Sequence, residues 1–244
     1  LRQRAIEILR PDWYSAQNSD VVEGSDDAVQ HFRESGIDED RSPCLLFDPG
    51  WYRNCVGDLP IDEPAILHYL SGGWRDGFDP SPLFDTAWYS VQMTADGYAK
   101  SLLEHYLLVG GAAGLSPQPL FDPEWYANEL ALKEGRSVPA DLTSWEHFLA
   151  IGWKSDLDPG PMFDTSKYLV AHRDVASSDV NPLIHYLTHG LAEGRVASPA
   201  HRESIVASPL QRAANMFRLP WYCEQYPDAG RTTDRCPRRA AHHE

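Results

Sequence analysis

The sequence predicts an all-α fold, a helix-turn-helix repeat array (α-solenoid) of about five and a half units of 37–42 residues. A histidine followed by an aromatic residue occurs five times, and a glycine stands five residues after each of these histidines. The histidine spacings are 37, 37, 42 and 38 residues, and Trp-Tyr pairs recur between them. A period of this length is typical of units that bury their apolar faces by stacking on one another.

The first predicted helix of each unit begins at an Asp-Pro or Asp-Thr step and carries the Trp-Tyr pair. The Asp side chain accepts hydrogen bonds from amides of the first helical turn, where a proline leaves no amide unsatisfied. The Phe before the Asp and the Tyr at the fourth helical position are spaced to form a hydrophobic staple. We therefore expect the paired tyrosines and tryptophans in the core. In the four inner units the Phe, Asp and Tyr residues are Phe47, Asp48 and Tyr52; Phe84, Asp85 and Tyr89; Phe121, Asp122 and Tyr126; Phe163, Asp164 and Tyr168.

The second predicted helix surrounds the repeated histidine, and its N-cap is expected four residues before that histidine. The expected N-cap residues are Asp27, Pro64, Ser101, Thr143 and Asn181. We expect the repeated glycine to end this helix in a left-handed conformation, and a Gly or Asp four residues later to form a second tight turn. The histidines are interpreted as structural, each hydrogen-bonded to a backbone carbonyl or to an Asp of a neighbouring unit. The His and Gly pairs are His31 and Gly36, His68 and Gly73, His105 and Gly110, His147 and Gly152, and His185 and Gly190.

The repeat boundaries predict one helical-repeat domain over residues 1–230. Residues 1–8 have the pattern of a helical lead-in, and a basic tail over residues 231–244 is predicted to be disordered. The predicted units span 8–45, 46–82, 83–119, 120–161 and 162–199, followed by an insertion at 200–215 and a partial unit at 216–230.

Composition and charge exclude several kinds of partner. The formal net charge is −15, so nucleic acid and anionic lipid are not expected, since binding to phosphates requires a basic surface. No stretch reaches the roughly 18–20 apolar residues of a membrane helix, and no secretory leader is recognisable. We expect a cytoplasmic protein, with a peripheral position at the inner membrane or secretion as alternatives. The cysteines Cys44, Cys55, Cys223 and Cys236 match no common metal-site spacing, and we expect thiols.

Two stretches of the chain show the repeat motif most clearly: Phe-Asp-Thr-Ala-Trp-Tyr at residues 84–89 and Asn-Pro-Leu-Ile-His-Tyr-Leu-Thr-His-Gly-Leu-Ala-Glu-Gly-Arg at residues 181–195. This pattern resembles repeats that accompany bacterial glycosyltransferases and sulfotransferases of cell-surface polysaccharide assembly. The resemblance covers about residues 8–230. It implies a setting in surface-glycan synthesis, with catalysis in a separate domain, and it supplies no catalytic residue. The first and last units depart from the pattern, because Arg10 and Arg218 replace the capping Asp.

No residue is assigned a catalytic, cofactor-binding or metal-binding role, because a structural task explains every repeated residue. Candidate contacts with a protein partner or a glycan lie where the repeat pattern fails. Trp74 and Trp153 follow their glycines outside the Trp-Tyr pattern and are expected to be exposed. Lys167 replaces a tryptophan of the pattern, and Arg195 is a candidate anion contact. The Asp-x-Asp element at residues 38–40 is interpreted as part of a turn.

The leading functional hypothesis is a non-catalytic helical-repeat module that binds a protein partner or positions a glycan. A second hypothesis makes the chain a glycosyltransferase, which would require a Rossmann-like alternation of strands and helices that the sequence does not show. A third hypothesis is a carbohydrate-binding module that uses exposed tryptophans.

Overall fold

The computed structural model describes residues 1–21, 25–93, 100–140 and 142–197. Within these ranges the protein is helix-rich and contains no β-strand, which confirms the all-α class; isolated bridges join Ser81 to Phe84 and Gly160 to Phe163. The chain divides into two compact bodies, the first formed by Leu1–Val109 and the second beginning at Gly110. The predicted insertion, partial sixth unit and basic tail, with Cys223 and Cys236, lie outside the described residues.

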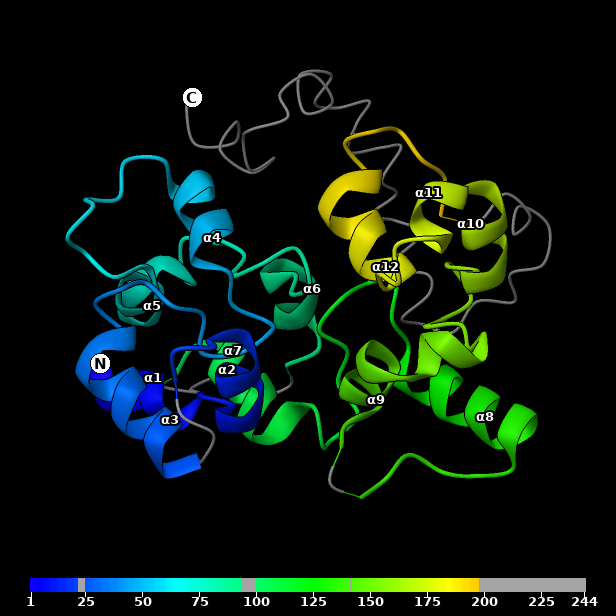
Figure 1. The fold of residues 1–244 in the computed structure, drawn as a ribbon, viewed down its shortest axis with the longest axis horizontal. Helices are drawn as coiled ribbons and strands as arrows, with labels where there is room; N and C mark the ends of the chain where they lie inside the picture. Colours follow the sequence, from blue (N-terminus) through cyan, green and yellow to red (C-terminus); the bar gives the residue numbers. More distant parts are fainter. Residues whose placement is uncertain (22–24, 94–99, 141, 198–244) are drawn as a thin grey trace. The chain divides into compact units, whose positions relative to one another are not determined.

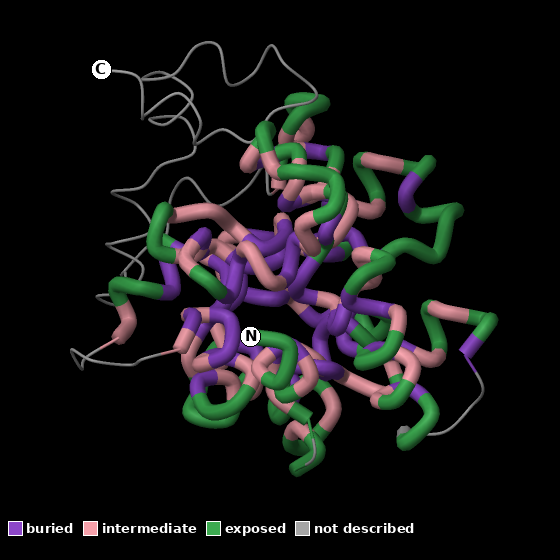
Figure 2. The backbone as a smooth tube through the Cα atoms, turned by 90° about the vertical axis from the view of Figure 1, so that its left-hand side faces the viewer, coloured by how far each residue is buried: buried purple, intermediate pink, exposed green. Residues whose placement is uncertain are grey.

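Each body is built from short helices (Figure 1). In the first body these are α1 (Arg2–Glu7), α2 (Pro11–Gln17), α3 (Ser25–His31), α4 (Pro49–Val56), α5 (Ala65–His68), α6 (Thr86–Val91) and α7 (Leu102–His105). In the second they are α8 (Pro123–Glu134), α9 (Ser144–Ala150), α10 (Thr165–Ala171), α11 (Arg173–Ala176) and α12 (Pro182–His185). Buried and exposed stretches alternate closely along the backbone (Figure 2), as expected for short helices that each bury one face. None of the helices in the described ranges has the length and apolar character that a membrane span requires.

The first helix of each inner unit begins where the sequence predicts. Asp48, Asp85, Asp122 and Asp164 are the N-caps of α4, α6, α8 and α10, and each side chain accepts a backbone amide of the first turn at 2.8–3.1 Å. The hydrophobic staples are also formed, with Phe and Tyr ring centroids 5.1–5.8 Å apart in all four units. In α2 the N-cap is Arg10, which makes no side-chain capping bond.

The N-cap of the second helix lies four residues before the histidine in four of the five units, as predicted. Ser101 and Thr143 form complete capping boxes with the glutamates three residues later, and Asn181 caps α12. The prediction is wrong for Asp27, because α3 already begins at Ser25 and Asp27 lies in its first turn. Four of the helices then widen into a π-helical turn: Phe32–Gly36, Tyr69–Gly73, Tyr106–Gly110 and Tyr186–Gly190.

A left-handed residue ends each second helix, but not at the repeated glycine. Positive φ angles of 55–83° occur four residues later, at Asp40, Gly77, Gly114, Asp156 and Gly194. The carbonyl of each repeated glycine accepts the amide five residues on, at 2.8–3.3 Å, which is the closing bond of a Schellman motif. The predicted second turn is therefore the true helix end. The prediction of a left-handed conformation at the repeated glycine is wrong, because the helix runs one turn further.

Backbone hydrogen bonds join the beginning of a unit to its end. The amide at the N-cap position of the first helix donates to a proline carbonyl in the extended segment that closes the same unit. The pairs are Arg10 to Pro43 at 2.9 Å, Asp48 to Pro80 at 3.0 Å and Asp122 to Pro159 at 2.9 Å. The proline segments therefore hold the two ends of these three units together.

The lead-in helix α1 closes the first body through contacts across about 100 residues. The Arg4 guanidinium donates two hydrogen bonds to the Glu104 carboxylate, at 2.6 and 2.8 Å, and a third to the Leu70 carbonyl at 3.1 Å. The Arg10 guanidinium donates to the Leu107 carbonyl at 2.8 Å. Burial alone would raise the pKa of Glu104, but the hydrogen bonds from Arg4 and Ser101 lower it. We call this set of contacts the α1 clasp.

The sequence carries the two arginines of the α1 clasp a second time at the same spacing. Gln3-Arg4-Ala5 recurs as Gln-Arg-Ala at residues 211–213, and in both copies an Arg follows six residues after the first Arg and a Trp-Tyr pair three residues after that. The second copy lies outside the described residues. Its spacing is consistent with a sequence that is duplicated at a level above the single unit.

Loss of Arg4 should destabilise the first body far more than loss of its neighbour Arg2. In Arg4→Ala the Glu104 carboxylate, whose side chain is fully buried, loses its charged partner, and we expect a cost of about 2 kcal/mol in the free energy of unfolding. Arg2→Ala removes an exposed pair with Asp38 and should cost under about 0.5 kcal/mol. Urea unfolding followed by tryptophan fluorescence measures both; equal effects would contradict this role of the clasp.

Candidate functional site

The same contact between a tyrosine and a histidine recurs once in each of the five units. The hydroxyl of the paired tyrosine lies within hydrogen-bond distance of Nδ1 of the repeated histidine. The pairs are Tyr14 and His31 at 3.0 Å, Tyr52 and His68 at 2.8 Å, Tyr89 and His105 at 2.6 Å, Tyr126 and His147 at 2.5 Å, and Tyr168 and His185 at 3.0 Å. All five tyrosines are fully buried. Each bond ties the first helix of a unit to the second helix of the same unit.

The repeated glycine supplies the space for this hydroxyl. A Cβ placed on Gly73 would lie 1.9 Å from the Tyr52 hydroxyl oxygen, and one on Gly152 would lie 2.0 Å from that of Tyr126. The corresponding distances at Gly36 and Gly190 are 2.3 and 2.6 Å, both below any real carbon–oxygen contact. The glycine therefore recurs because the tyrosine oxygen packs directly on its Cα. We call this arrangement the Tyr–His–Gly contact.

Burial sets the protonation states of these groups. It raises the pKa of Tyr14 and Tyr168 to about 12 and that of Tyr52 and Tyr126 still further, so the phenols stay protonated. Burial also lowers the pKa of His105, His147 and His185, which favours neutral imidazoles. A protonated phenol facing a neutral imidazole donates to Nδ1 and leaves the imidazole proton on Nε2.

The histidines are thus structural, but their partner differs from the one expected. Each pairs with the tyrosine of its own unit rather than with a carbonyl or a neighbouring Asp. The tyrosine and the histidine are 16 or 17 residues apart in the first, second, third and fifth units. They are 21 residues apart in the fourth unit, so the contact tolerates a longer loop. Within the described ranges, no group of three or more His, Cys, Asp or Glu side chains is arranged to hold a metal ion.

The tryptophans of the Trp-Tyr pairs are less uniform than the tyrosines. Trp88 is buried, but Trp13 and Trp51 are half-buried and Trp125 is 43% exposed. The expectation that all of them are core residues is wrong, because the staple turns the tyrosine inward and leaves the preceding position at the edge of the helix. The loss of the tryptophan at Lys167 is explained by this position: Lys167 is exposed and pairs with Asp164 at 2.7 Å.

The other candidate contacts lie in different surroundings. Trp74 is half-buried, with the Arg75 guanidinium 4.3 Å from its ring centroid. Trp153 is only 8% exposed, so its expected exposure is wrong: in this unit a 3-10 turn, Gly152–Ser155, replaces the π-helical turn and carries the ring inward. Arg195 pairs with both Asp174 and Glu193, at 2.8 and 2.5 Å, so its charge is already matched.

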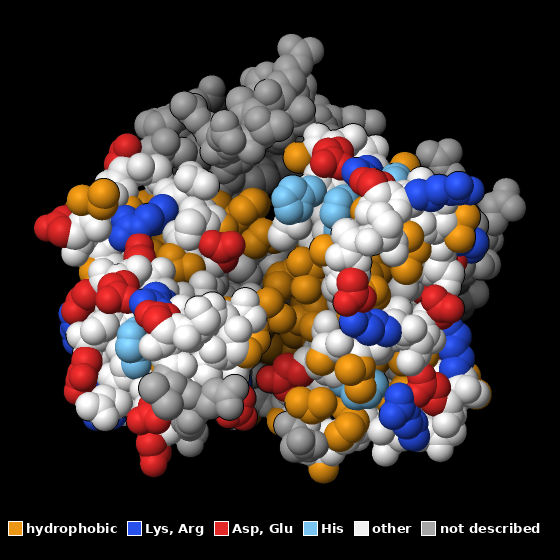
Figure 3. All heavy atoms as spheres, viewed as in Figure 1, with side chains coloured by type: hydrophobic (Ala, Val, Ile, Leu, Met, Phe, Trp, Pro, Cys, Tyr) orange, Lys and Arg blue, Asp and Glu red, His pale blue; other side chains and the backbone are white. Residues whose placement is uncertain are grey.

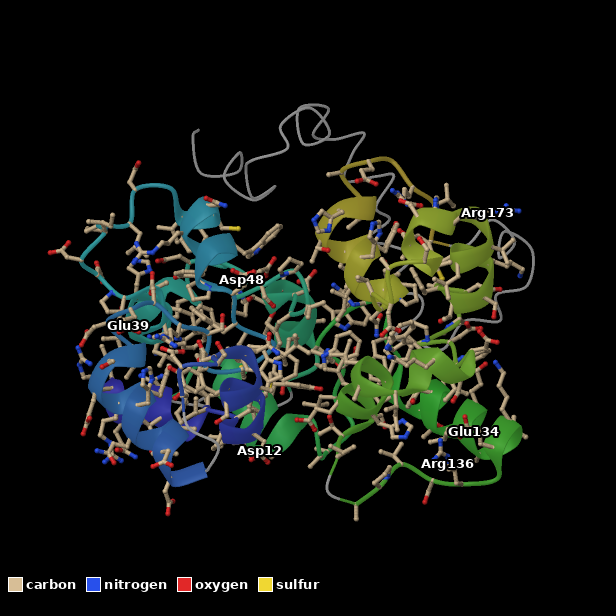
Figure 4. All side chains as sticks on the ribbon, in the orientation of Figure 1. Asp12, Glu39, Asp48, Glu134, Arg136 and Arg173 are labelled. Atoms are coloured by element: carbon tan, nitrogen blue, oxygen red, sulfur yellow. The ribbon has the colours of Figure 1, made fainter. Side chains whose placement is uncertain are left out.

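A hollow of about 410 Å³ lies in the first body between α2 and the extended segment before α4. No sequence pattern predicts this hollow, because it forms where two segments some thirty residues apart meet. Asp48, at the start of α4, is labelled in Figure 4. The hollow is lined by Trp13, Gln17, Asn18, Asp40, Arg41, Ser42, Cys44, Leu45, Phe47 and Asp48.

Ion pairs hold the charged walls of this hollow in place. The Arg41 guanidinium bonds Asp20 through two nitrogens, at 2.6 and 2.7 Å, and its Nε bonds Glu39 at 2.6 Å. These bonds lower the pKa of Asp20 to about 2. Asp40 is paired with Arg53 and accepts the Ala65 amide at 2.7 Å. Acidic and basic side chains are likewise interspersed on the face in Figure 3, which shows no continuous basic patch.

Comparison of the chain with protein-family models, with curated proteins and with solved structures gives no significant match. The resemblance to repeats of surface-polysaccharide enzymes therefore stays a prediction.

Filling the glycine of one Tyr–His–Gly contact should be strongly destabilising. Gly73→Ala forces a methyl group against the Tyr52 hydroxyl, and we expect a cost of about 2–3 kcal/mol in the free energy of unfolding. Combining it with Tyr52→Phe, which removes that oxygen, should cost clearly less than the sum of the two single changes. The adjacent Gly72 has open space and is the matched control: Gly72→Ala should be neutral or stabilising by up to about 1 kcal/mol. Additive effects of Gly73→Ala and Tyr52→Phe would contradict the contact.

Stability should fall as the solution becomes acidic. A histidine whose folded-state pKa lies below its unfolded value of 6.5 contributes stability above that pH, which is lost as pH falls through the folded-state pKa. His105, His147 and His185 all act in this direction. Asp158 opposes them, because burial raises its pKa to about 6. Its contribution to stability is therefore largest below pH 3.8, its unfolded-state pKa, and is lost as the pH rises through about 6.

Chemical unfolding at pH 7.5 and at pH 5 measures this balance. We expect a lower free energy of unfolding at pH 5, and a larger difference in Asp158→Asn, which lacks the opposing group. Equal or greater stability of Asp158→Asn at pH 5 would show that the imidazoles are not held neutral, because this variant lacks the opposing group.

Proposed function

We propose that the chain is a non-catalytic helical-repeat module that binds a protein partner. The observation that carries this proposal is that the residues which recur from unit to unit are engaged within the fold. The Asp caps, the staples and the Tyr–His–Gly contacts all join parts of the same unit. What varies between units is the exposed surface, and variable surface on a repeated scaffold is typical of binding proteins.

A stacked, solenoid-like arrangement of the units is part of the proposal. Hydrogen bonds between consecutive units support it: the Ala65 amide donates to Asp40 of the first unit at 2.7 Å, and the Asn181 side chain donates to the Leu149 carbonyl of the fourth unit at 3.4 Å. The α1 clasp adds a feature that simple stacking lacks, because it ties the lead-in helix to the second helix of the third unit. A cytoplasmic setting beside a surface-polysaccharide glycosyltransferase or sulfotransferase is proposed on the sequence resemblance alone.

The outer faces of the first helices are the proposed contact surface. They expose large apolar side chains that the fold does not need: Val91 on α6 is 62% exposed and Val170 on α10 is 79% exposed. On α8, Trp125 and Leu132 are 43% and 86% exposed, and they lie seven residues apart on one helical face. Tryptophans at such positions often supply a large share of binding energy at interfaces.

The proposal is tested by mixing the full chain with a bacterial cell-surface polysaccharide glycosyltransferase, the class of partner that the sequence resemblance implies, and measuring complex formation by light scattering after size exclusion. Trp125→Ala with Leu132→Ala should weaken the complex at least about tenfold while leaving unfolding unchanged. Arg2→Ala, an exposed change on the lead-in helix α1 and outside the first helices, is the control variant. Robust transfer from activated sugars by the isolated chain would contradict the proposal and favour a glycosyltransferase.

A further inference from the structure

We propose that the hollow beside Trp13 is a binding site for a neutral sugar residue of an oligosaccharide. The hollow lies in the first body, whereas Trp125 and Leu132 of the partner-binding test lie in the second, so the two proposals are tested independently. Its size supports a small ligand, because small-molecule sites are typically clefts of about 300–1,000 Å³ and this one measures about 410 Å³. Its lining combines one indole ring with polar groups.

The indole supplies an apolar platform. Trp13 belongs to a Trp-Tyr pair, and its neighbour Tyr14 occupies the core and makes the contact with His31. Trp13 itself is half-buried and lines the hollow, so part of its ring surface remains open. The C–H face of a pyranose packs on such a ring as an apolar surface, while its hydroxyls point to the sides.

Three polar groups are available for those hydroxyls. The Gln17 amide and the Ser42 hydroxyl have no hydrogen-bond partner among the described residues, and both line the hollow. Asp48 uses Oδ1 to cap α4, where it accepts the Trp51 amide at 2.9 Å, and this leaves Oδ2 as an acceptor. Together they offer both donors and acceptors, which is what a sugar hydroxyl requires.

Charge selects against an anionic ligand. Arg41 and Asp40 are neutralised by their own partners, Asp20 and Glu39 for the first and Arg53 for the second. Asp48 has no cationic partner in the part of the chain that the structure describes. One unmatched carboxylate therefore faces the hollow, which disfavours phosphates and uronic acids and leaves a neutral, hydroxyl-bearing ring as the fitting class.

The ion pairs make the site a built one. Arg41 is fixed by Asp20, Glu39 and the side-chain amide oxygen Oδ1 of Asn18, the last at 3.0 Å. Asn18 in turn donates to the Tyr14 carbonyl at 2.7 Å. Side chains held in this way are ordered before a ligand arrives, so less conformational entropy is lost on binding.

The full chain is titrated by calorimetry with maltohexaose and cellohexaose as neutral probes, with hexagalacturonic acid as the anionic probe and adenosine as a flat non-sugar probe. We expect one neutral hexasaccharide to bind, and hexagalacturonic acid and adenosine to bind at least about tenfold more weakly. Binding by neither neutral sugar, or tighter binding of the anionic sugar or of adenosine, would overturn the proposal.

Two variants locate the binding. Trp13→Ala and the milder Gln17→Ala should each lower the affinity for the neutral sugar, the first by about tenfold or more and the second by about threefold. Trp125→Ala removes an exposed tryptophan at the same position of another unit, one that does not line the hollow, and should change the affinity by less than about twofold. Gln17 lies at the exposed end of α2, so its variant stays informative if Trp13→Ala unfolds. An equal loss in Trp125→Ala, or no loss in Gln17→Ala, would overturn the assignment to this hollow.

Discussion

A tyrosine hydroxyl enclosed between an imidazole nitrogen and a glycine Cα is the interaction on which the repeat depends. A hydroxyl buried without a partner would destabilise the fold by a few kcal/mol, so every unit that buries this tyrosine must also provide an acceptor. The histidine provides it from the second helix. The glycine is required because a side chain there would occupy the position of the oxygen, as the Tyr52 and Gly73 geometry shows. One contact thereby explains three recurring residue types.

This contact also explains where the units can vary. The fourth unit has a longer first helix and loop, yet Tyr126 still reaches His147, because only the two ends of the connection are constrained. The tryptophan before the tyrosine lies outside the contact, and it ranges from buried at Trp88 to exposed at Trp125 or is replaced by Lys167. Surface for binding is thus available on elements whose inner face is fixed.

The sequence predicted most of what is local and little of what is distant. Asp caps and staples were predictable because they join residues within about one helical turn. The Tyr–His pairing was not, since it depends on how two helices face each other. The role of Gly73 was misassigned because a helix-ending glycine and a close-contact glycine look alike in sequence. The α1 clasp joins Arg4 to Glu104, and no periodicity indicates a bond between residues so far apart.

The candidate site likewise depends on contacts between distant segments, which the sequence does not predict. The sequence singled out Trp74 and Trp153 because they break the pattern, yet Trp153 is buried. The hollow instead lies beside Trp13, a member of the pattern, because polar side chains from a distant segment surround it.

The most direct test of this account is the tautomeric state of the five repeated histidines, measured from the side-chain nitrogen chemical shifts of the ¹⁵N-labelled protein by NMR at neutral pH. Donation from each tyrosine predicts that Nδ1 is the unprotonated, hydrogen-bonded nitrogen and that Nε2 carries the proton. Protonation at Nδ1 in these histidines would contradict the central claim.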